Sequence, residues 1–202
     1  IIEVFSHRVG FCGMLMENIQ VQLIDTPALN RDYVEPELLD LIRRATLPST
    51  ALTVGGVQLD SPLILAAGLI KGDGFDSEDT ALQTAAVRNI IPGWRTLPRL
   101  IGPVEFGSFT RWPRRGNPGV VVWRDVPSGS TQNRVGLKNP GVMAAAAFLG
   151  QRRDQLPACF GINIAVSPSV EAPDQQVAEV LTGLRAFIDQ GVYPQWFTLN
   201  LS

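Results

Sequence analysis

Four short apolar runs, separated by longer segments with helix signals, constrain the fold of this 202-residue chain more than any other feature. The runs are LILAA at 63–67, VEFGS at 104–108, FGINIAV at 160–166 and WFTLNL at 196–201. Apolar strands that alternate with helices are typical of parallel β/α architecture, in which helices cover the sheet. The sequence therefore predicts an α/β fold with about four parallel strands over residues 49–202.

Helix signals are clearest in three of the intervening segments, at 76–87, 140–153 and 172–191. Asp76 or Ser77 is expected to cap the first of these helices, and Gly191 is expected to end the last. Ahead of the first apolar run, ALTVGGVQL at 51–59 predicts a small hairpin with Gly55 and Gly56 at its turn.

The first block, residues 1–48, predicts a helical extension, since PELLDLIRRA repeats apolar residues at helical spacing. No apolar run in the chain reaches the ~20 residues that a membrane-spanning helix needs. The block is therefore expected either to lie on a membrane surface or, the plainer alternative, to pack against the main domain.

Composition excludes several classes of function. A hydrophobic content of 45% supports one substantial core with an appendage, and a net charge of −2 gives no electrostatic support for nucleic-acid binding. Cys12 and Cys159 form no C-x-x-C pair, which argues against a disulfide framework and against a metal site. His7 is the only histidine, so acid–base chemistry would need another residue type or residues beyond this chain.

Glycines, amides and hydroxyls lie in, end or follow the predicted strands: Gly68, Gly107, Ser108, Asn163, which lies within its strand, Asn200 and Ser202. The carboxyl ends of parallel strands meet at one edge, where β/α barrels carry their active sites. Amides can both donate to and accept from a flat heterocycle. Each residue taken singly could instead be a turn former, and it is the repetition that indicates a site. The loop TQNRVGLKNPG at 131–141 adds further amides and cations to this set.

Five segments, in order along the chain, resemble motifs of the dihydroorotate dehydrogenases, specifically the membrane-associated class that uses quinone. They are AAGLIKGDG at 66–74, VEFGSFT at 104–110 with GNP at 116–118, QNRVGLKNPG at 132–141, GINI at 161–164 and TLNLS at 198–202. The resemblance implies a (β/α)8 TIM barrel of which this chain forms the N-terminal half. The helical block at 1–48 fits the extension that distinguishes this class.

The same resemblance implies a chemistry, the FMN-dependent oxidation of dihydroorotate to orotate in pyrimidine biosynthesis, with quinone as the acceptor. The resemblance also implies roles for individual residues. The substrate would be oriented by Lys71, Asn133 and Asn200. FMN would be lined by Ala66, Ala67, Gly68, Ser108 and Asn163. Arg124 matches an arginine of the quinone tunnel in this class, although it could also be an ordinary surface arginine.

Several positions depart from the family pattern. Ile70 stands where the family usually has aspartate, Ala165–Ser167 replaces a Gly-Lys-Asn sequence, and Leu137 and Lys138 replace a Phe-Asn pair. The serine that serves as general base in this class is expected one residue beyond Ser202, and the second half of the barrel is expected in further chain. The chain alone is therefore expected to be inactive and to bind FMN poorly.

A second hypothesis follows from these departures: a catalytically decayed relative that serves as an accessory subunit of a membrane complex. A third, a flavin oxidoreductase of another pyrimidine type, is disfavoured by the N-terminal block and Arg124. The first two place the protein at the periphery of a bacterial cytoplasmic membrane or a mitochondrial inner membrane.

Unpaired strand edges are expected to require a covering partner, either the missing half of the barrel or neighbouring subunits. The segment VRNIIPGWRTLPRL at 87–100 is expected either to contact that partner or to be a solvated loop. Tryptophan and arginine are enriched at interfaces, and this segment contains Arg88, Trp94, Arg95 and Arg99.

Overall fold

The computed structural model describes residues 51–201, so the helical extension expected over 1–48 lies outside the described residues. The described part begins with the expected hairpin, β1 (Leu52–Val54) and β2 (Val57–Leu59), which pair antiparallel. Gly55 and Gly56 form its turn with φ angles of +56° and +84°, which glycine adopts without steric cost. This prediction is confirmed.

Three parallel strands form the central sheet, in the order β3 (Val104–Phe109), β6 (Phe160–Ala165) and β7 (Trp196–Asn200). The first predicted strand along the chain, 63–67, does not form a full strand; it makes a single parallel bridge between Leu65 and Val104. The Leu65 N–H donates to Pro103 O at 2.9 Å, and Leu65 O accepts from Glu105 N–H at 2.8 Å. The four apolar runs therefore lie side by side in chain order, although only three are full strands.

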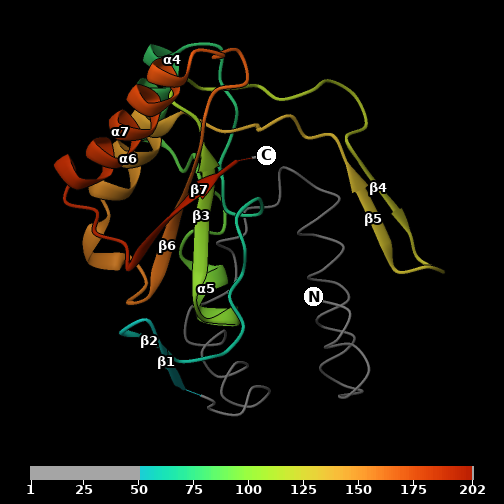
Figure 1. The fold of residues 1–202 in the computed structure, drawn as a ribbon, viewed down its shortest axis with the longest axis vertical. Helices are drawn as coiled ribbons and strands as arrows, with labels where there is room; N and C mark the ends of the chain where they lie inside the picture. The colour runs from blue at the N-terminus through green and yellow to red at the C-terminus, as the bar shows by residue number, and fades with distance from the viewer. Residues whose placement is uncertain (1–50, 202) are drawn as a thin grey trace.

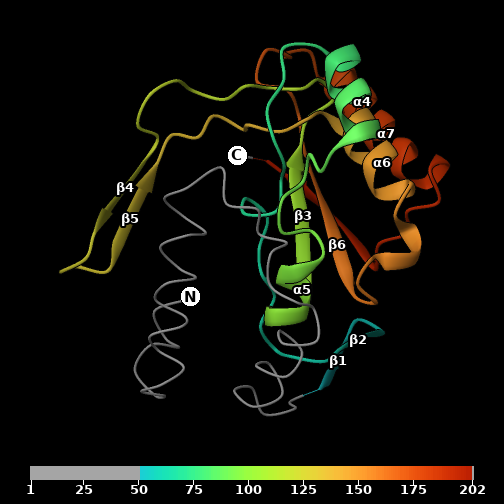
Figure 2. The ribbon, with the colours of Figure 1, turned by 180° about the vertical axis from the view of Figure 1, so that it is seen from behind.

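The three expected helices, α4 (Glu78–Val87), α6 (Val142–Gly150) and α7 (Pro173–Asp189), all lie on one face of this sheet (Figures 1 and 2). Strand and helix side chains pack there into one core, in which Phe109 and Phe187 lie with ring centroids 5.7 Å apart. The largest fully buried side chains include Phe106, Phe109, Phe148, Phe187, Ile162 and Ile164. A continuous apolar core on one face leaves the other face of the sheet for polar residues.

The apolar residues from Ile90 to Leu97 in the segment 87–100 belong to this core. The segment leads into α5 (Thr96–Ile101), and the Trp94 side chain is only 5% exposed. Its ring meets Phe148 edge to face, with centroids 5.9 Å apart. Trp94 therefore does not serve as an anchor for a partner, and the alternative of a solvated loop is wrong as well, because Ile90, Ile91 and Leu97 pack with Trp94 in the chain's own core.

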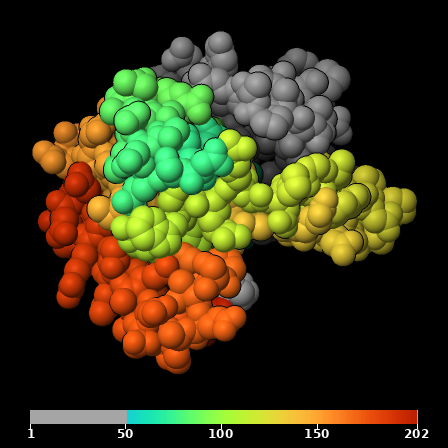
Figure 3. All heavy atoms as spheres, turned by 90° about the horizontal axis from the view of Figure 1, so that it is seen from above, coloured from blue at the N-terminus to red at the C-terminus, as the bar shows by residue number. Residues whose placement is uncertain are grey.

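A second hairpin, β4 (Val122–Asp125) with β5 (Ser130–Asn133), extends away from the sheet and from the helices (Figures 1 and 3). All of its strand residues are exposed. The sequence did not predict it, because its strands lack the alternation of apolar and polar residues that marks a half-buried strand. A short 3₁₀ helix, η1 (Arg153–Gln155), follows α6.

Ser77 rather than Asp76 caps α4, since its Oγ accepts from the Thr80 N–H at 3.2 Å. Replacing Ser77 with alanine is expected to lower the free energy of unfolding by about 1 kcal/mol, because that N–H loses its acceptor. Urea unfolding of the full-length protein followed by circular dichroism measures this loss. Ser77→Asp, which keeps a capping oxygen, is the matched control, and equal losses in both variants would contradict the prediction.

Within residues 51–201, no helix combines the length and apolar character that crossing a membrane requires.

Candidate functional site

The sheet face opposite the helices carries polar side chains. Register places Glu105 beside Gly161 and Gly161 beside Trp196, and it pairs Asn163 with Thr198. Side chains alternate across a strand, so Glu105, Asn163 and Thr198 share this face while Phe106 and Ile162 face the core. A cluster of a carboxylate, an amide and a hydroxyl therefore lies within the sheet itself.

Ser108 joins this face through an irregularity in β3. The register between β3 and β6 shifts between Phe106 and Phe109, which breaks the strict alternation of side chains. The Asn200 Nδ2 then donates to Ser108 Oγ at 3.0 Å, which links the carboxyl ends of β7 and β3. Gly107 makes the shift feasible, because its φ is +114° and an added Cβ would lie 2.5 Å from Asn163 O.

The loop after the first apolar run is held against the end of β3 by two backbone hydrogen bonds. The Gly68 N–H donates to Gly107 O at 2.6 Å, and the Gly107 N–H donates to Ile70 O at 2.9 Å. Ala66 and Ala67 precede this contact. Ile70 is 0% exposed and belongs to the hydrophobic core, so the departure from the family's aspartate is accommodated by apolar packing.

Lys71 comes next in the same loop and is only partly exposed. Burial and, to a smaller extent, the charge of Lys138 together lower the pKa of Lys71 from 10.5 to about 8. A lysine of this kind is cationic at neutral pH but is close to its titration point. It lies beside the carboxyl end of β3, since its neighbour Ile70 is bonded to Gly107.

Glu105 is the hydrogen-bond centre of the polar face. Its Oε1 accepts from the Trp196 Nε1–H at 2.8 Å and from the Thr198 hydroxyl, and its Oε2 accepts from the Asn163 Nδ2–H at 3.3 Å. Burial alone would raise the pKa of Glu105, but the hydrogen bonds from Thr198, Trp196, Asn163 and the Ala67 N–H outweigh it and lower that pKa. Glu105 is therefore an ionised carboxylate that only accepts hydrogen bonds.

Trp196 reaches Glu105 across Gly161. A Cβ at position 161 would lie 2.1 Å from the indole Nε1, so the indole occupies the space that a side chain would fill. Sequence reasoning missed Glu105 and this contact. The available signal was a charged residue inside an otherwise apolar strand, VEFGS, since a buried charge needs partners.

Asn163 carries an unusual feature. Its side chain is 7% exposed, and Oδ1 is a buried acceptor without a hydrogen-bond partner among the described residues. Buried polar atoms are nearly always satisfied, so such an atom indicates a group that is supplied from elsewhere. Together with Ser108, Asn200 and the Gly68 backbone, it forms a polar cluster near the carboxyl ends of the strands.

Two predicted site residues lie away from this cluster. Asn133 and Arg124 lie on the projecting hairpin, on β5 and β4, and both are exposed (Figure 1). The Asn133 Oδ1 accepts from the Val135 N–H at 3.4 Å. The structure therefore does not bring Asn133 or Arg124 to Ser108 and Asn200, and their roles toward substrate and quinone stay predictions.

The segment 131–141 also contains a buried amide with a structural role. Asn139 is 0% exposed, and its Oδ1 accepts from the N–H groups of Thr110 at 3.2 Å and Gly141 at 2.8 Å. Its Nδ2 donates to Thr110 Oγ1 and to Leu137 O. Asn139 thus joins the end of β3 to the start of α6.

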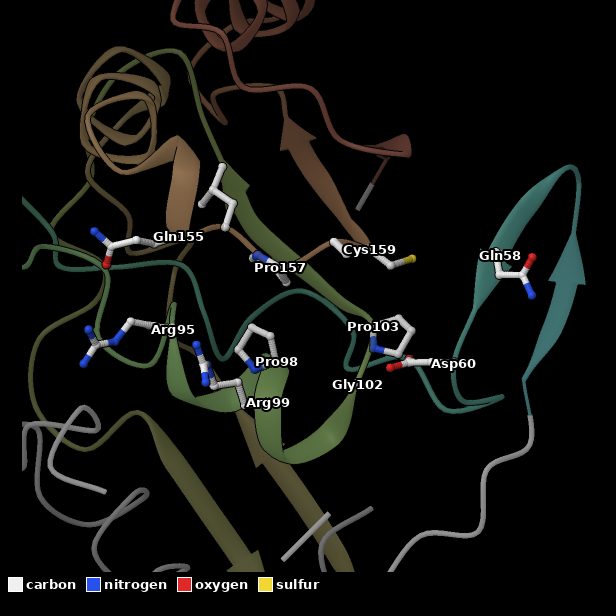
Figure 4. A pocket seen from close by; sticks show the side chains of 12 residues that line it. Gln58, Asp60, Arg95, Pro98, Arg99, Gly102, Pro103, Gln155, Pro157 and Cys159 are labelled. Atoms are coloured by element: carbon white, nitrogen blue, oxygen red, sulfur yellow. The ribbon is translucent and has the colours of Figure 1, made fainter. Parts of the chain in front are cut away.

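A pocket of about 530 Å³ lies at the opposite, amino end of the sheet (Figure 4). Its walls come from the β1–β2 hairpin, from α5, and from the segments that precede β3 and β6. They include Gln58, Asp60, Arg95, Arg99, Pro103 and Cys159. None of the predicted site residues lines it, so it is separate from the polar cluster.

The fold and the cluster define a class: an α/β protein of parallel βα units with polar side chains at the carboxyl ends of its strands. Its sequence relatives identify the family. Proteins named dihydroorotate dehydrogenase (quinone) match from Allorhizobium ampelinum (32% identity over 155 residues), Mycobacterium bovis (34% over 137) and Mycolicibacterium paratuberculosis (30% over 165). The chain belongs to the dihydroorotate dehydrogenase family, and the predicted resemblance is confirmed.

The matches cover 77%, 66% and 82% of this chain, but the chain spans little more than a third of those relatives, namely 36%, 33% and 38%. No protein-family model matches the sequence.

Solved structures agree on the fold. DHODH from Eimeria tenella in complex with ferulenol superposes with a TM-score of 0.56 at 21% identity and covers 91% of this chain and 46% of that one. The ligand-free form of the same enzyme gives a TM-score of 0.55.

Proposed function

We propose that the protein containing this chain is an FMN-dependent dihydroorotate dehydrogenase that oxidises dihydroorotate to orotate and passes electrons to a quinone. The observation that carries the proposal is the polar cluster toward the carboxyl edge of a parallel sheet, which contains Ser108, Asn200 and the Oδ1 of Asn163, an acceptor without a partner among residues 51–201. The names of the relatives supply the reaction, since they are called dihydroorotate dehydrogenase (quinone).

The residues present fit a flavin. Gly68 carries no side chain, and no other part of the described chain lies within 4 Å of the position that its Cβ would take, so a planar ring can approach the backbone there. The hydroxyl of Ser108 and the amide of Asn163 offer polar contacts. Ala66 and Ala67 add a small, apolar wall. When bound, FMN would accept the hydride removed from dihydroorotate.

Toward the substrate, we assign orientation to three side chains of this chain. Asn200 offers an amide to the imide edge of a pyrimidine, and Asn133 would do the same if the hairpin closes over the edge. The Lys71 ammonium stabilises the negative charge that develops during the reaction.

We further propose that the sheet is the first half of a (β/α)8 barrel, as the order of Leu65, β3, β6 and β7 suggests. Two surfaces support a covering partner. β7 is an edge strand among residues 51–201, with Leu199 54% exposed, and the outer side of α7 exposes Val177, Leu181 and Ile188 at helical spacing. The remaining half of the barrel would cover both.

Quinone access is proposed through residues 1–48 and Arg124, which would place the protein at the periphery of a membrane. The source of that membrane, bacterial or mitochondrial, does not affect the chemistry.

FMN binding tests the proposal directly. The full-length protein is expected to bind FMN and to show flavin absorbance. The double variant Ser108→Ala/Asn200→Ala is expected to bind FMN more weakly, on the order of 10-fold, because two polar partners are removed. Quenching of flavin fluorescence measures the dissociation constants. Ser128→Ala, on the distant β4–β5 turn, is the matched control, because its hydroxyl donates to Asp125 on the same exposed hairpin, away from the polar cluster. A full-length protein without flavin after FMN is added would defeat the proposal.

The second candidate is an accessory subunit of a membrane complex, and it rests on the buried Ile70 and Ala165 at positions where the family pattern has other residues. It predicts that the full-length protein binds no FMN and copurifies with neighbouring subunits through β7 and the outer side of α7.

A further inference from the structure

Glu105 is a charged residue outside the set that the family resemblance assigns, and its side-chain partners all come from the strands of the central sheet. Glu105 lies on the polar face between the Trp196 indole, the Thr198 hydroxyl and the Asn163 amide. Its carboxylate does not lie at the carboxyl edge, so it does not itself contact a ligand bound there. Its contact with Asn163 nevertheless decides whether the Asn163 amide presents a hydrogen-bond donor or an acceptor to a ligand.

A side-chain amide has a donor end and an acceptor end, and its rotation decides which end faces a ligand. The ionised carboxylate of Glu105 can only accept hydrogen bonds, so the Nδ2 of Asn163 must face it, at 3.3 Å. Oδ1 is thereby turned away from Glu105, and it is the buried acceptor that has no partner among residues 51–201.

We propose that Glu105 is a positioning residue that fixes the Asn163 amide with Oδ1 toward the site, so that the site selects a ligand with an N–H donor on a flat ring. The ligand chemistry is an imide N–H, which both a flavin and a pyrimidine such as orotate carry. The inference rests on the proposed function and adds the residue that sets its hydrogen-bond polarity.

The low pKa of Glu105 agrees with this role. The same four donors that hold the carboxylate keep it ionised near neutral pH, and the Trp196 indole occupies the space above Gly161. A neutral glutamine at position 105 could donate to Oδ1 instead, which would allow the Asn163 amide to rotate and present its N–H₂ group to the ligand. Two facing N–H donors would then repel one another.

A double-mutant cycle on the full-length protein tests the inference, with Glu105→Gln, Asn163→Ala and the double variant. Dissociation constants are measured for FMN by fluorescence quenching and for orotate by its effect on the spectrum of the bound flavin. Glu105→Gln is expected to raise the dissociation constant of one of the two ligands on the order of 10-fold when Asn163 is present. The increase should be less than about 2-fold when residue 163 is alanine. A purely structural role for Glu105 would give equal losses in both backgrounds.

The affected ligand identifies the source of the N–H. Loss of FMN affinity assigns it to the flavin, and loss of orotate affinity with unchanged FMN affinity assigns it to the pyrimidine. Equal losses in both backgrounds, or no loss for either ligand, would overturn the inference while leaving the proposed function intact. A wild-type protein that binds neither ligand would defeat the proposed function, and the inference would fall with it.

Two further variants separate positioning from stability. Trp196→Phe removes one donor to Glu105 but leaves the contact with Asn163, so it is expected to lower the melting temperature and to change ligand affinity less than about 3-fold. If Glu105→Gln does not fold, Glu105→Asp replaces it in the same cycle, since it keeps the charge but withdraws the carboxylate from Asn163 by one methylene.

Discussion

Replacing Lys71 with alanine is expected to lower the turnover of dihydroorotate by the full-length protein on the order of 100-fold. A preorganised cation beside developing negative charge contributes an effect of this size, because it needs no reorganisation during the reaction. Lys71 is suited to this role, since its backbone is held through Ile70 and Gly107 and its side chain is partly buried. Steady-state kinetics with a soluble quinone measure the change, and the expected loss is in kcat more than in KM.

Turnover should also depend on pH through this group. Burial and the charge of Lys138 lower the pKa of Lys71 to about 8, so the ammonium that assists the reaction is present below pH 8 and is lost as the pH rises through it. The linked effect on stability has its own sign. The folded state releases this proton at lower pH than the unfolded chain does, so the contribution of Lys71 to stability rises with pH between about 8 and 10.5.

Lys138→Gln is the matched variant, because it removes the neighbouring charge and keeps Lys71. The alkaline limb of the pH–rate profile should then move to higher pH while turnover at neutral pH is kept. An unchanged turnover in Lys71→Ala, or an alkaline limb that Lys138→Gln does not move, would contradict the prediction and would leave Lys71 with a structural role only.

Replacing Asn139 with alanine is expected to lower the free energy of unfolding on the order of 3 kcal/mol. The fully buried amide accepts from the N–H groups of Thr110 and Gly141, and both lose their partner in this variant. Leaving a buried donor unsatisfied costs about 1–3 kcal/mol, so two such donors and a small cavity account for the expected loss. Urea unfolding measures it.

Asn117→Ala provides the control for this loss. The Asn117 Nδ2 also donates to a backbone carbonyl, Arg134 O at 2.7 Å, but the side chain is exposed and water can replace the contact. Its loss should stay below about 1 kcal/mol. Similar losses in the two variants would show that burial of Asn139 is not what makes it important.

The sheet and its helices were largely predictable, because continuous apolar runs and local helix signals, such as the Ser77 cap of α4, depend on nearby residues. The runs at 104–108, 160–166 and 196–201 became β3, β6 and β7. The run at 63–67 did not become a full strand, because its chain leaves the sheet after Leu65 to bond Gly68 to Gly107. The β4–β5 hairpin was missed because exposed strands carry no burial pattern.

The candidate site was predictable in its residues but not in its hydrogen-bond network. Ser108 and Asn200 were expected at the same edge, and they are in contact. Glu105 was not expected, since its role depends on partners from β6 and β7 that lie 58 to 93 positions away along the chain. Asn133 was expected at this edge on its motif alone, but the hairpin that carries it extends outward.

The indole of Trp196 lies where a side chain at position 161 would be, so we expect the residues at these two positions to change together among relatives. Relatives that keep tryptophan at position 196 should keep glycine at 161, and relatives with a smaller residue at 196 are free to carry a side chain there. Where the indole is lost, position 105 loses a donor, so a change at this glycine should be accompanied by a change in how the carboxylate of Glu105 is held.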